Sequence, residues 1–286
     1  ATEFSRQRTE TYGKSFLISS HEATGEEQFQ QLCSLDVLGL KEQDPQSKDF
    51  DHQRFKEQIT LKREGYYETK LPWRYAAGTD LPHNREQAHS RLKSTTRKLE
   101  KMGKLVEYDA IMREQLTAGM LEDAPMEPTG PVVHVIPDNA VFRPESKTTP
   151  LRIVYDASAK AGPSDPSLND MLEKGPNLLP KIFEIMVRNR FKRFVITGDI
   201  KKAFHMVHVA PIDRDAQRIL WYNNLKDRKV KEYRFTRIIF GSTSSPYILN
   251  ATLEKHLETF EKNPEYAHTI KTLKQDTYVD DVSGWG

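Results

Sequence analysis

The stretch that decides the fold is QDTYVDDVSGWG, residues 275–286. It places two carboxylates side by side, Asp280 and Asp281, directly behind a tyrosine and a valine. Adjacent acids repel each other and resist burial unless a cation or a hydrogen-bond donor compensates them. The simplest structure for 276–286 is a β-hairpin with the two acids at its turn. The pair therefore raises the question of what compensates its charge.

Composition limits the class of protein. The chain has 286 residues, of which 37% are hydrophobic and 29% charged, with a mean hydropathy of -0.70 and a net charge of +2. Cys33 is the only cysteine, which excludes an internal disulfide or a thiolate metal cage and favours a reducing compartment. No apolar run approaches the roughly 20 residues of a membrane span, and no signal-peptide pattern is present. We therefore expect a soluble, intracellular protein.

Hydrophobic periodicity and turn residues predict a mixture of helices and strands. Residues 1–28, 43–53 and 162–180 have the polar or proline-rich character of lead-in, linker and loop. Helices are expected over 29–40, 84–103 with Asn84 as N-cap, 108–121, 181–190 and 247–262. Strands are expected over 65–75 (interrupted by Pro72), twice within 131–156 around a turn at 146–150, and over 194–198 and 231–240. Because strands and helices do not alternate strictly, the chain is predicted to be α+β.

A local excess of positive charge lies between residues 181 and 202. Its basic residues are Lys181, Arg188, Arg190, Lys192, Arg193, Lys201 and Lys202, and its acids are Glu184 and Asp199. Such a segment can face a polyanion. It can equally be a solvated helix face, and charge alone leaves both interpretations open.

Asp199 offers a third carboxylate. It directly follows the apolar strand expected at 194–198, so its side chain can project into a cleft at the strand end. If the hairpin with Asp280 and Asp281 lies beside this strand, three carboxylates converge, and divalent cations such as Mg²⁺ would remove the repulsion. Two such ions are the usual device for in-line displacement at phosphorus. The alternative is three unrelated acids, with the pair an ordinary Asp-rich turn.

Three motifs in this order resemble the palm motifs of reverse transcriptases. They are FVITGDIKKAF (194–204), RIIFGSTSSP (237–246) and YVDD (278–281). Upstream segments resemble the BEL/Pao group of LTR retrotransposon polyproteins: LPWRY (71–75), NREQAHSRL (84–92), IPDNAVFRPESKTTPLRIVYDASAK (136–160) and SLNDMLEKGPNLLP (167–180). The resemblance covers about residues 29–286, and several ordered motifs are more specific than YVDD alone.

The resemblance implies an α+β right-hand polymerase fold with fingers and palm and without the thumb. Residues 1–80 would be an N-terminal lead-in or linker extension. Residues 81–198 would form the fingers with the first palm elements, and 199–286 the palm with its catalytic hairpin, truncated behind it.

The resemblance also implies roles for individual residues. Asp199, Asp280 and Asp281 would be the catalytic, metal-binding acids, with Ile200 completing the metal site. The implied nucleotide-binding residues are Arg143, Lys147, Arg152, Lys201, Lys202, Ala203, Phe204, Phe240 and Gly241, and the implied primer–template contacts are Tyr278 and Val279. Phe204 takes the position of the aromatic steric gate, whereas Arg152 takes that of an arginine gripping the triphosphate. Core packing of Phe204, solvated charge at Arg143 and Lys147, and plain β-propensity at Tyr278 remain alternatives.

The implied activity is RNA-directed DNA polymerisation by two Mg²⁺ ions, with Mn²⁺ as the alternative metal. Its partners would be deoxynucleoside triphosphates, a primer on an RNA or DNA template, and the thumb, ribonuclease H, protease and integrase of the polyprotein, with no membrane. Such a protein would be cytoplasmic, within virus-like particles. We expect the intact polyprotein to polymerise DNA and these residues alone to have little activity, since phosphate contacts dominate primer–template affinity. The alternative is an inactive or domesticated fragment that acts as a nucleic-acid-binding or structural module.

Two other patterns were weighed against this interpretation. His205 and His208 lie near Asp199, and two histidines with a carboxylate can bind a transition metal, but the alternation HMVHV suits a strand equally well. VSGWG (282–286) resembles a segment of chymotrypsin-like serine proteases. A serine protease needs a nucleophile with His and Asp partners, and the motifs that carry them are absent from the sequence.

Overall fold

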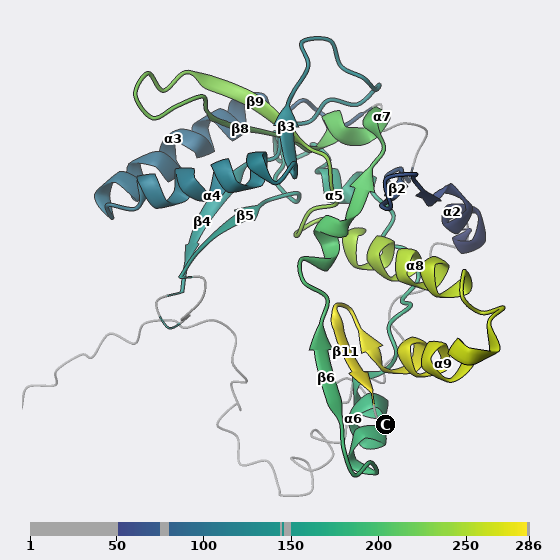
Figure 1. Cartoon of the computed structure of the whole chain (residues 1–286). Helices are drawn as coiled ribbons and strands as arrows, with labels where there is room; N and C mark the ends of the chain where they lie inside the picture. Colours follow the sequence, from purple (N-terminus) through teal and green to yellow (C-terminus); the bar gives the residue numbers. More distant parts are fainter. Residues whose placement is uncertain (1–50, 75–79, 144, 146–149, 285–286) are drawn as a thin grey trace, which may run out of the picture. The chain divides into compact units, whose positions relative to one another are not determined.

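The computed structural model describes residues 51–74, 80–143, 145 and 150–284 (Figure 1). Residue contacts divide the chain into two compact units, Ala1–Gln43 and Asp44–Gly286, and every described residue belongs to the second. The helix expected over 29–40 and most of the 1–80 lead-in lie outside the described residues. So does the tip of the turn at 146–149, which contains Lys147.

The described part contains both helices and strands, which confirms the α+β prediction. The helices are α2 (His52–Gln58), α3 (Arg85–Lys101), α4 (Leu105–Thr117), α5 (Leu168–Met171), α6 (Ile182–Arg190), α7 (Pro211–Arg214), α8 (Ser245–Glu258) and α9 (Ala267–Asp276). Short 3₁₀ turns are η2 (Ala203–Met206), η3 (Asp215–Gln217) and η4 (Pro264–Tyr266). The strands are β1 (Thr60–Leu61), β2 (Tyr67–Thr69), β3 (Leu121–Asp123), β4 (Asp138–Phe142), β5 (Leu151–Tyr155), β6 (Ile196–Asp199), β7 (Val207–Val209), β8 (Arg218–Tyr222), β9 (Val230–Phe235), β10 (Thr277–Tyr278) and β11 (Asp281–Gly284).

Three three-stranded sheets and one hairpin organise these elements. Their strand orders are β1-β2-β7, β10-β11-β6, β3-β9-β8 and β4-β5. All pairings are antiparallel except that of β2 with β7. Helix α3 packs against β4 and β8. The largest fully buried side chains there include Trp221 of β8 and Tyr108 of α4, whose rings lie 4.9 Å apart.

The helix expected from Asn84 is confirmed, although its start differs in detail. Asn84 precedes α3 in the left-handed region, with φ 58°, and its side chain makes no capping hydrogen bond. Its amide instead donates to the carbonyl oxygen of Val135 at 3.1 Å. The helix expected over 108–121 begins earlier, at Leu105, because the apolar face continues N-terminally, and it gives way to a turn in which Gly119 adopts φ 65°.

Two expected strands are shorter than predicted. β2 ends at Thr69 because the residues after it bond to a side chain instead of a strand: the amide of Leu71 and the indole of Trp73 both donate to the carboxylate of Asp213. β9 ends at Phe235, so Phe240 falls in the turn before α8.

The hairpin expected within 131–156 is confirmed as β4–β5, paired from Asp138 with Tyr155 to Phe142 with Leu151.

Within the described ranges, the structure contains no helix of the length and apolar character that crossing a membrane requires.

Candidate active site

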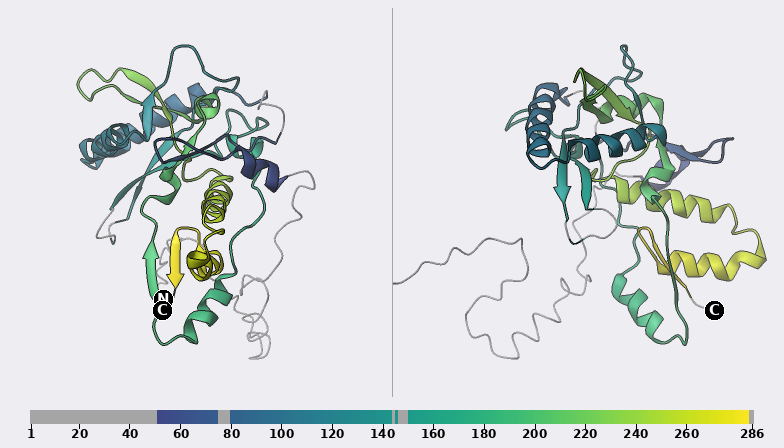
Figure 2. Two further views of the ribbon diagram at one scale, coloured as in Figure 1. Left: turned by 45° about the vertical axis from the view of Figure 1, so that its right-hand side comes forward. Right: turned by 60° about the vertical axis from the view of Figure 1, so that its left-hand side comes forward.

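The β6–β11 pairing brings Asp199 and Asp281 together. These strands are antiparallel, and Asp281 is the Cα partner of Asp199 (Figures 1 and 2). The amide of Ile200 donates to the carbonyl oxygen of Asp280 at 2.9 Å, one residue beyond the pair on each strand. This bond makes Asp199 and Asp281 a non-hydrogen-bonded pair, in which facing side chains approach most closely. Two carboxylates therefore stand opposite each other on the same face of the sheet, with Asp280 beside them in the turn.

The three carboxylates are uncompensated by the rest of the described chain. Asp199 and Asp281 are exposed and Asp280 is half-buried. Among the residues that the structure describes, none of the three carboxylates accepts a hydrogen bond or forms an ion pair. Like charges directly opposite on adjacent strands are destabilising, so this corner would be stabilised by a bound cation.

The donor atoms suit a hard divalent cation. Carboxylate oxygens are the ligands that Mg²⁺ and Mn²⁺ prefer in proteins, and no sulfur or imidazole ligand takes part. Within the described ranges, no set of three or more His, Cys, Asp or Glu side chains is already arranged around a common metal position. The backbone register fits a site that Asp199, Asp281 and Asp280 would form by rotation of their side chains.

The hairpin turn carries backbone strain. Val279 follows Tyr278, the Cα partner of Asp281, and adopts φ 60°. A β-branched residue in this region is a genuine outlier, and such outliers cluster at functional sites. The strain gives the Asp280–Asp281 turn a property that an ordinary Asp-rich turn lacks.

A buried ion pair holds the hairpin against α6. The Nε of Arg188 donates to the carboxylate of Asp276 at 2.8 Å, and its Nη2 donates to the carbonyl oxygen of Gln275 at 2.6 Å. The Asp276 carboxylate is almost fully buried, at the point where α9 runs into β10. The hydroxyl of Ser283 on β11 also donates to the Asp276 carbonyl. Sequence analysis placed Arg188 only in a basic segment and did not single out Asp276, because nothing in the sequence pairs them.

The segment after Asp199 turns sharply into the core. Lys202 has φ 54° and pairs with Glu114 at 3.2 Å, while Lys201 is exposed. Ala203 and Phe204 are buried in η2. The Phe204 ring lies 4.5 Å from that of Phe240, so the structure brings together two aromatic residues that the resemblance assigned to the nucleotide site.

Gly241 joins the loop before α8 to the β5 side of the fold. It has φ 95°, and a Cβ atom there would lie 2.6 Å from the carbonyl oxygen of Tyr155, so only glycine fits. Asn169 fixes the same loop: its amide nitrogen donates to the Gly241 carbonyl at 3.0 Å, and its amide oxygen accepts from the Thr243 amide at 2.8 Å. Sequence analysis missed this role of Asn169, although it lies in the quoted segment SLNDMLEKGPNLLP.

The other predicted nucleotide-binding residues lie on the β4–β5 hairpin. Arg152 is exposed on β5, opposite Val141. Arg143 follows β4, where its amide bonds to the Pro150 carbonyl at 2.8 Å. No contact in the described part joins either side chain to the three aspartates, so their grouping with the site remains a prediction. Lys147 lies outside the described residues.

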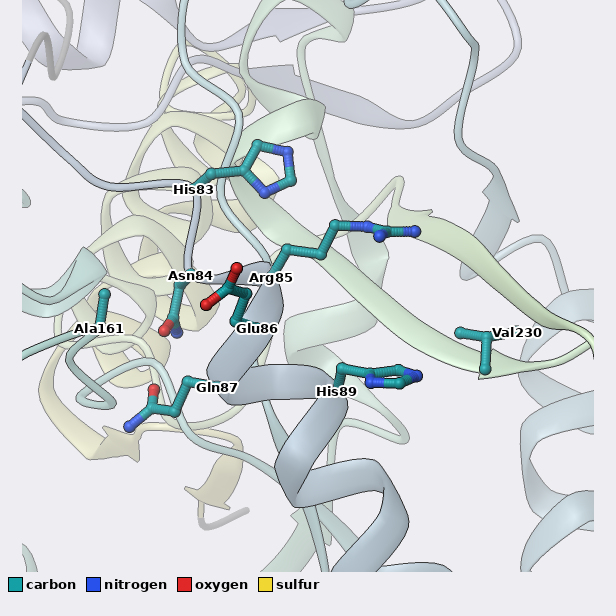
Figure 3. A pocket seen from close by; sticks show the side chains of 8 residues that line it. All are labelled: His83, Asn84, Arg85, Glu86, Gln87, His89, Ala161 and Val230. Atoms are coloured by element: carbon teal, nitrogen blue, oxygen red, sulfur yellow. The ribbon is translucent and has the colours of Figure 1, made fainter.

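A separate pocket opens at the start of α3 (Figure 3). Its volume is about 680 Å³, and His83, Asn84, Arg85, Glu86, Gln87, His89, Ala161 and Val230 line it. None of these residues belongs to the predicted site. The three aspartates lie instead on the β6–β11 pair, with Asp199 and Asp281 exposed, and an open surface of this kind suits a large ligand.

Comparison with known proteins gives no assignment: no family model matches the chain, and no curated protein matches it either. The resemblance to reverse transcriptases therefore rests on the motifs quoted above, and the activity it implies belongs to the proposal below.

Proposed function

We propose that this chain is the fingers and palm portion of an RNA-directed DNA polymerase, of the kind found in BEL/Pao-type retrotransposon polyproteins. The observation that carries the proposal is the register of β6 with β11, which sets Asp199 opposite Asp281 in a non-hydrogen-bonded pair. The sequence predicts this convergence if the hairpin lies beside the strand that ends at Asp199. Paired, uncompensated carboxylates on a sheet surface suit metal-assisted nucleotidyl transfer.

In this proposal Asp199, Asp280 and Asp281 hold Mg²⁺. When bound, the two ions lower the charge on the triphosphate, activate the primer 3′-hydroxyl and stabilise the departing pyrophosphate. Within the segment Ile200 to Ala203, the amides of Lys201 and Lys202 would face the phosphates, because those of Ile200 and Ala203 already donate to carbonyl oxygens of the chain. Phe204, buried against Phe240, forms a rigid wall where the sugar would lie. A bulky ring at that place excludes a 2′-hydroxyl and so favours deoxynucleotides.

Primer extension on an RNA template, with deoxynucleoside triphosphates and Mg²⁺, tests the proposal. The assay compares this chain and a polyprotein that carries it with the variants Asp199→Asn and Asp281→Asn. Both variants should lose extension by at least about a hundredfold while remaining folded, because each removes a metal ligand. Asp227→Asn, an exposed aspartate of the β8–β9 turn, is the matched control and should extend normally. Wild-type extension by either site variant would refute the metal-site assignment, and a polyprotein without any extension would refute the activity.

A second candidate function is single-stranded nucleic-acid binding without catalysis. Phe191 and Phe194 are 84% and 68% exposed, and they alternate with Arg190, Lys192 and Arg193. The Arg193 guanidinium lies 5.4 Å from the centre of the Phe194 ring. Exposed aromatic rings between cations are the usual surface on which bases stack. Oligonucleotide binding that requires Phe191 and Phe194, in a polyprotein that extends no primer, would favour this function over the first.

A further inference from the structure

Arg237 has no carboxylate partner, unlike most of the partly buried arginines in the described part of the chain. Within the described part of the chain, Arg237 forms no ion pair, and its Nη1 donates only to the carbonyl oxygen of His205, at 3.1 Å. Its Nε is buried without a hydrogen-bond partner. Five other arginines that are buried or half-buried are paired with acids: Arg113 with Asp109, Arg188 with Asp276, Arg214 with Glu122, Arg218 with Asp215 and Glu232, and Arg234 with Glu122 and Asp215. Arg91, also half-buried, forms no ion pair among the described residues, but its charge acts on the Asp138 carboxyl.

The basic neighbours of Arg237 do not balance its charge, although one of them, Arg214, is itself paired with Glu122 and Glu68. Burial and the nearby Arg214 guanidinium lower the pKa of Arg237. Burial and the charge of Arg237 lower the pKa of His208 to about 4, with a further contribution from Arg214. Burial, Lys202 and Arg237 lower the pKa of His205. A partly buried charge without a counter-charge is costly, so a bound anion would stabilise the cluster formed by Arg237, His205 and His208.

Hydrogen-bonding capacity at the cluster is also unused. The Nδ1 of His205 is buried without a partner. His208 and Arg237 are joined by an isolated antiparallel bridge, and the Tyr66 ring stacks on His208 with ring centres 3.7 Å apart. The nearest acid in the register, Glu68 opposite His208, is already paired with Lys62 at 2.8 Å and with Arg214 at 3.8 Å. Arg237, His205, His208 and Tyr66 all remain partly accessible, which leaves room for a ligand to approach.

We propose that Arg237, together with His205 and His208, binds a phosphate group. The planar guanidinium fork matches phosphate oxygens bidentately, and a histidine can supply a further donor once it is protonated. The phosphate can belong to a nucleic-acid strand or to a free phosphate compound, since the chemistry recognised is the same. None of Arg237, His205 and His208 belongs to the three-aspartate site, but His205 borders the proposed nucleotide site, since its ring lies 5.3 Å from that of Phe240.

Phosphate binding should raise the pKa of both histidines, because the anion offsets the charge that depresses them. Binding then takes up protons, so affinity should rise as pH falls between the phosphate-bound and the free pKa of His208. The charged groups facing the histidines are Arg237, Arg214 from α7, Lys202 before η2, and Glu68 and Tyr66 at β2. Because Glu68 and Tyr66 face the histidines with and without ligand, a difference in the pKa of His205 or His208 between the two conditions is caused by the ligand.

The test follows the imidazole resonances of His205 and His208 by NMR during pH titrations, with and without inorganic phosphate and with a single-stranded oligodeoxynucleotide. We expect saturable binding and an upward shift of about one pKa unit for His208. Arg237→Gln should raise both histidine pKa values without ligand and weaken phosphate binding at least about tenfold, since it removes the charge that does both. Arg237→Lys keeps the positive charge but loses the planar guanidinium. The two histidines should therefore keep their low pKa values, while phosphate binding should be weaker than in the wild type. Lys226→Gln, an exposed charge on the β8–β9 turn, is the matched control and should bind as the wild type does.

Each outcome decides the proposal or the source of the phosphate. Absence of saturable binding of either probe, or equal affinity in Arg237→Gln and wild type, overturns it. If Arg237→Gln fails to fold, equal affinity in the folded Arg237→Lys variant overturns it instead. Arg237-dependent binding of the oligonucleotide alone identifies a nucleic-acid strand, and Arg237-dependent binding of both probes identifies the phosphate group itself. Asp281→Asn should leave phosphate binding unchanged, which separates this site from the polymerase proposal.

Discussion

Replacing Asp281 by asparagine should stabilise the metal-free protein and abolish its response to Mg²⁺. Asp281 faces Asp199 across a non-hydrogen-bonded pair, so the two carboxylates repel each other at short range. Facing Cβ atoms in such a pair are about 5 Å apart. At that distance two unit charges repel by about 0.8 kcal/mol in bulk water, and by more in a less polar environment. Both residues are exposed, which favours the lower figure, and we expect a gain of about 1 kcal/mol in the free energy of unfolding.

A bound metal ion should also stabilise the wild type, but only while both carboxylates are present. A cation that binds only the folded state stabilises it by RT ln(1 + [L]/Kd), which is about 1.4 kcal/mol at a concentration ten times the Kd. Urea denaturation of the wild type and Asp281→Asn, each in EDTA and in excess Mg²⁺, measures all four free energies. The wild type should gain stability from Mg²⁺, whereas the variant should start higher in EDTA and gain little.

Two controls make the result decisive. Asp227→Asn removes one exposed negative charge outside the site and should leave the Mg²⁺ response intact. Sodium chloride at matched ionic strength separates general screening from binding, because screening acts on every exposed pair. An Asp281→Asn variant that is no more stable in EDTA, and that gains as much from Mg²⁺ as the wild type, would refute the pairing of the two carboxylates as a cation site.

Three further outcomes follow from the structure. Arg188→Gln should destabilise the chain by about 2–3 kcal/mol in urea denaturation, because it leaves a buried carboxylate without its partner; a loss below about 0.5 kcal/mol would contradict this. Burial raises the pKa of Asp138 to about 6, so stability falls between pH 4 and 6 as the unfolded chain loses the proton that the folded chain keeps. Burial lowers the pKa of His134 to about 4, so stability rises over the same interval as the unfolded chain loses a proton that the folded chain has already lost. The stability of Asp138→Asn should therefore rise over this interval and that of His134→Gln should fall, each by about 2 kcal/mol, as denaturation at several pH values would show. Val279→Gly should melt no lower than the wild type because it relieves a positive φ, whereas the control Val282→Gly in β11 should melt lower.

Local patterns predicted the elements with strong signals and missed those formed by burial or by partners distant in sequence. The helices α3, α6 and α8 and the hairpins β4–β5 and β10–β11 follow from apolar periodicity and turn residues. Strand β8 was not predicted, because all five of its residues, RILWY, are buried and show no polar alternation. α2 was not predicted, since the expected linker at 43–53 covers only its first two residues and the rest was unassigned. α9 was not predicted either, because it lies between two stronger signals. Its only buried residues are Ile270 and Asp276.

The composition of the candidate site could be read from the sequence, but its geometry could not. The acids Asp199, Asp280 and Asp281 were named from spacing and motif. Their register depends on which residues of β6 and β11 face each other, and a slip of one residue would move every side chain to the other face. The Arg237 cluster was missed for a related reason. The sequence shows that an arginine is present, but only the fold shows that no acid reaches it.

The ion pair of Arg188 with Asp276 explains how a strained and repulsive turn is held in place. Val279 costs about 1–3 kcal/mol in backbone strain, and the facing carboxylates cost about 1 kcal/mol in repulsion. Two hydrogen bonds made by a charged guanidinium, to Asp276 and to the Gln275 carbonyl, contribute about 1.5–3 kcal/mol each, which is the same order as the sum of those costs. The ion pair fixes Asp276, the residue at which α9 runs into β10. It therefore restrains the hairpin without contacting the carboxylates of Asp199, Asp280 or Asp281. A cation bound at Asp199 and Asp281 would remove the repulsion and tighten the same corner. Metal binding and the Arg188 anchor should therefore act together on the opening of the hairpin, and metal should stabilise Arg188→Gln relative to metal-free conditions.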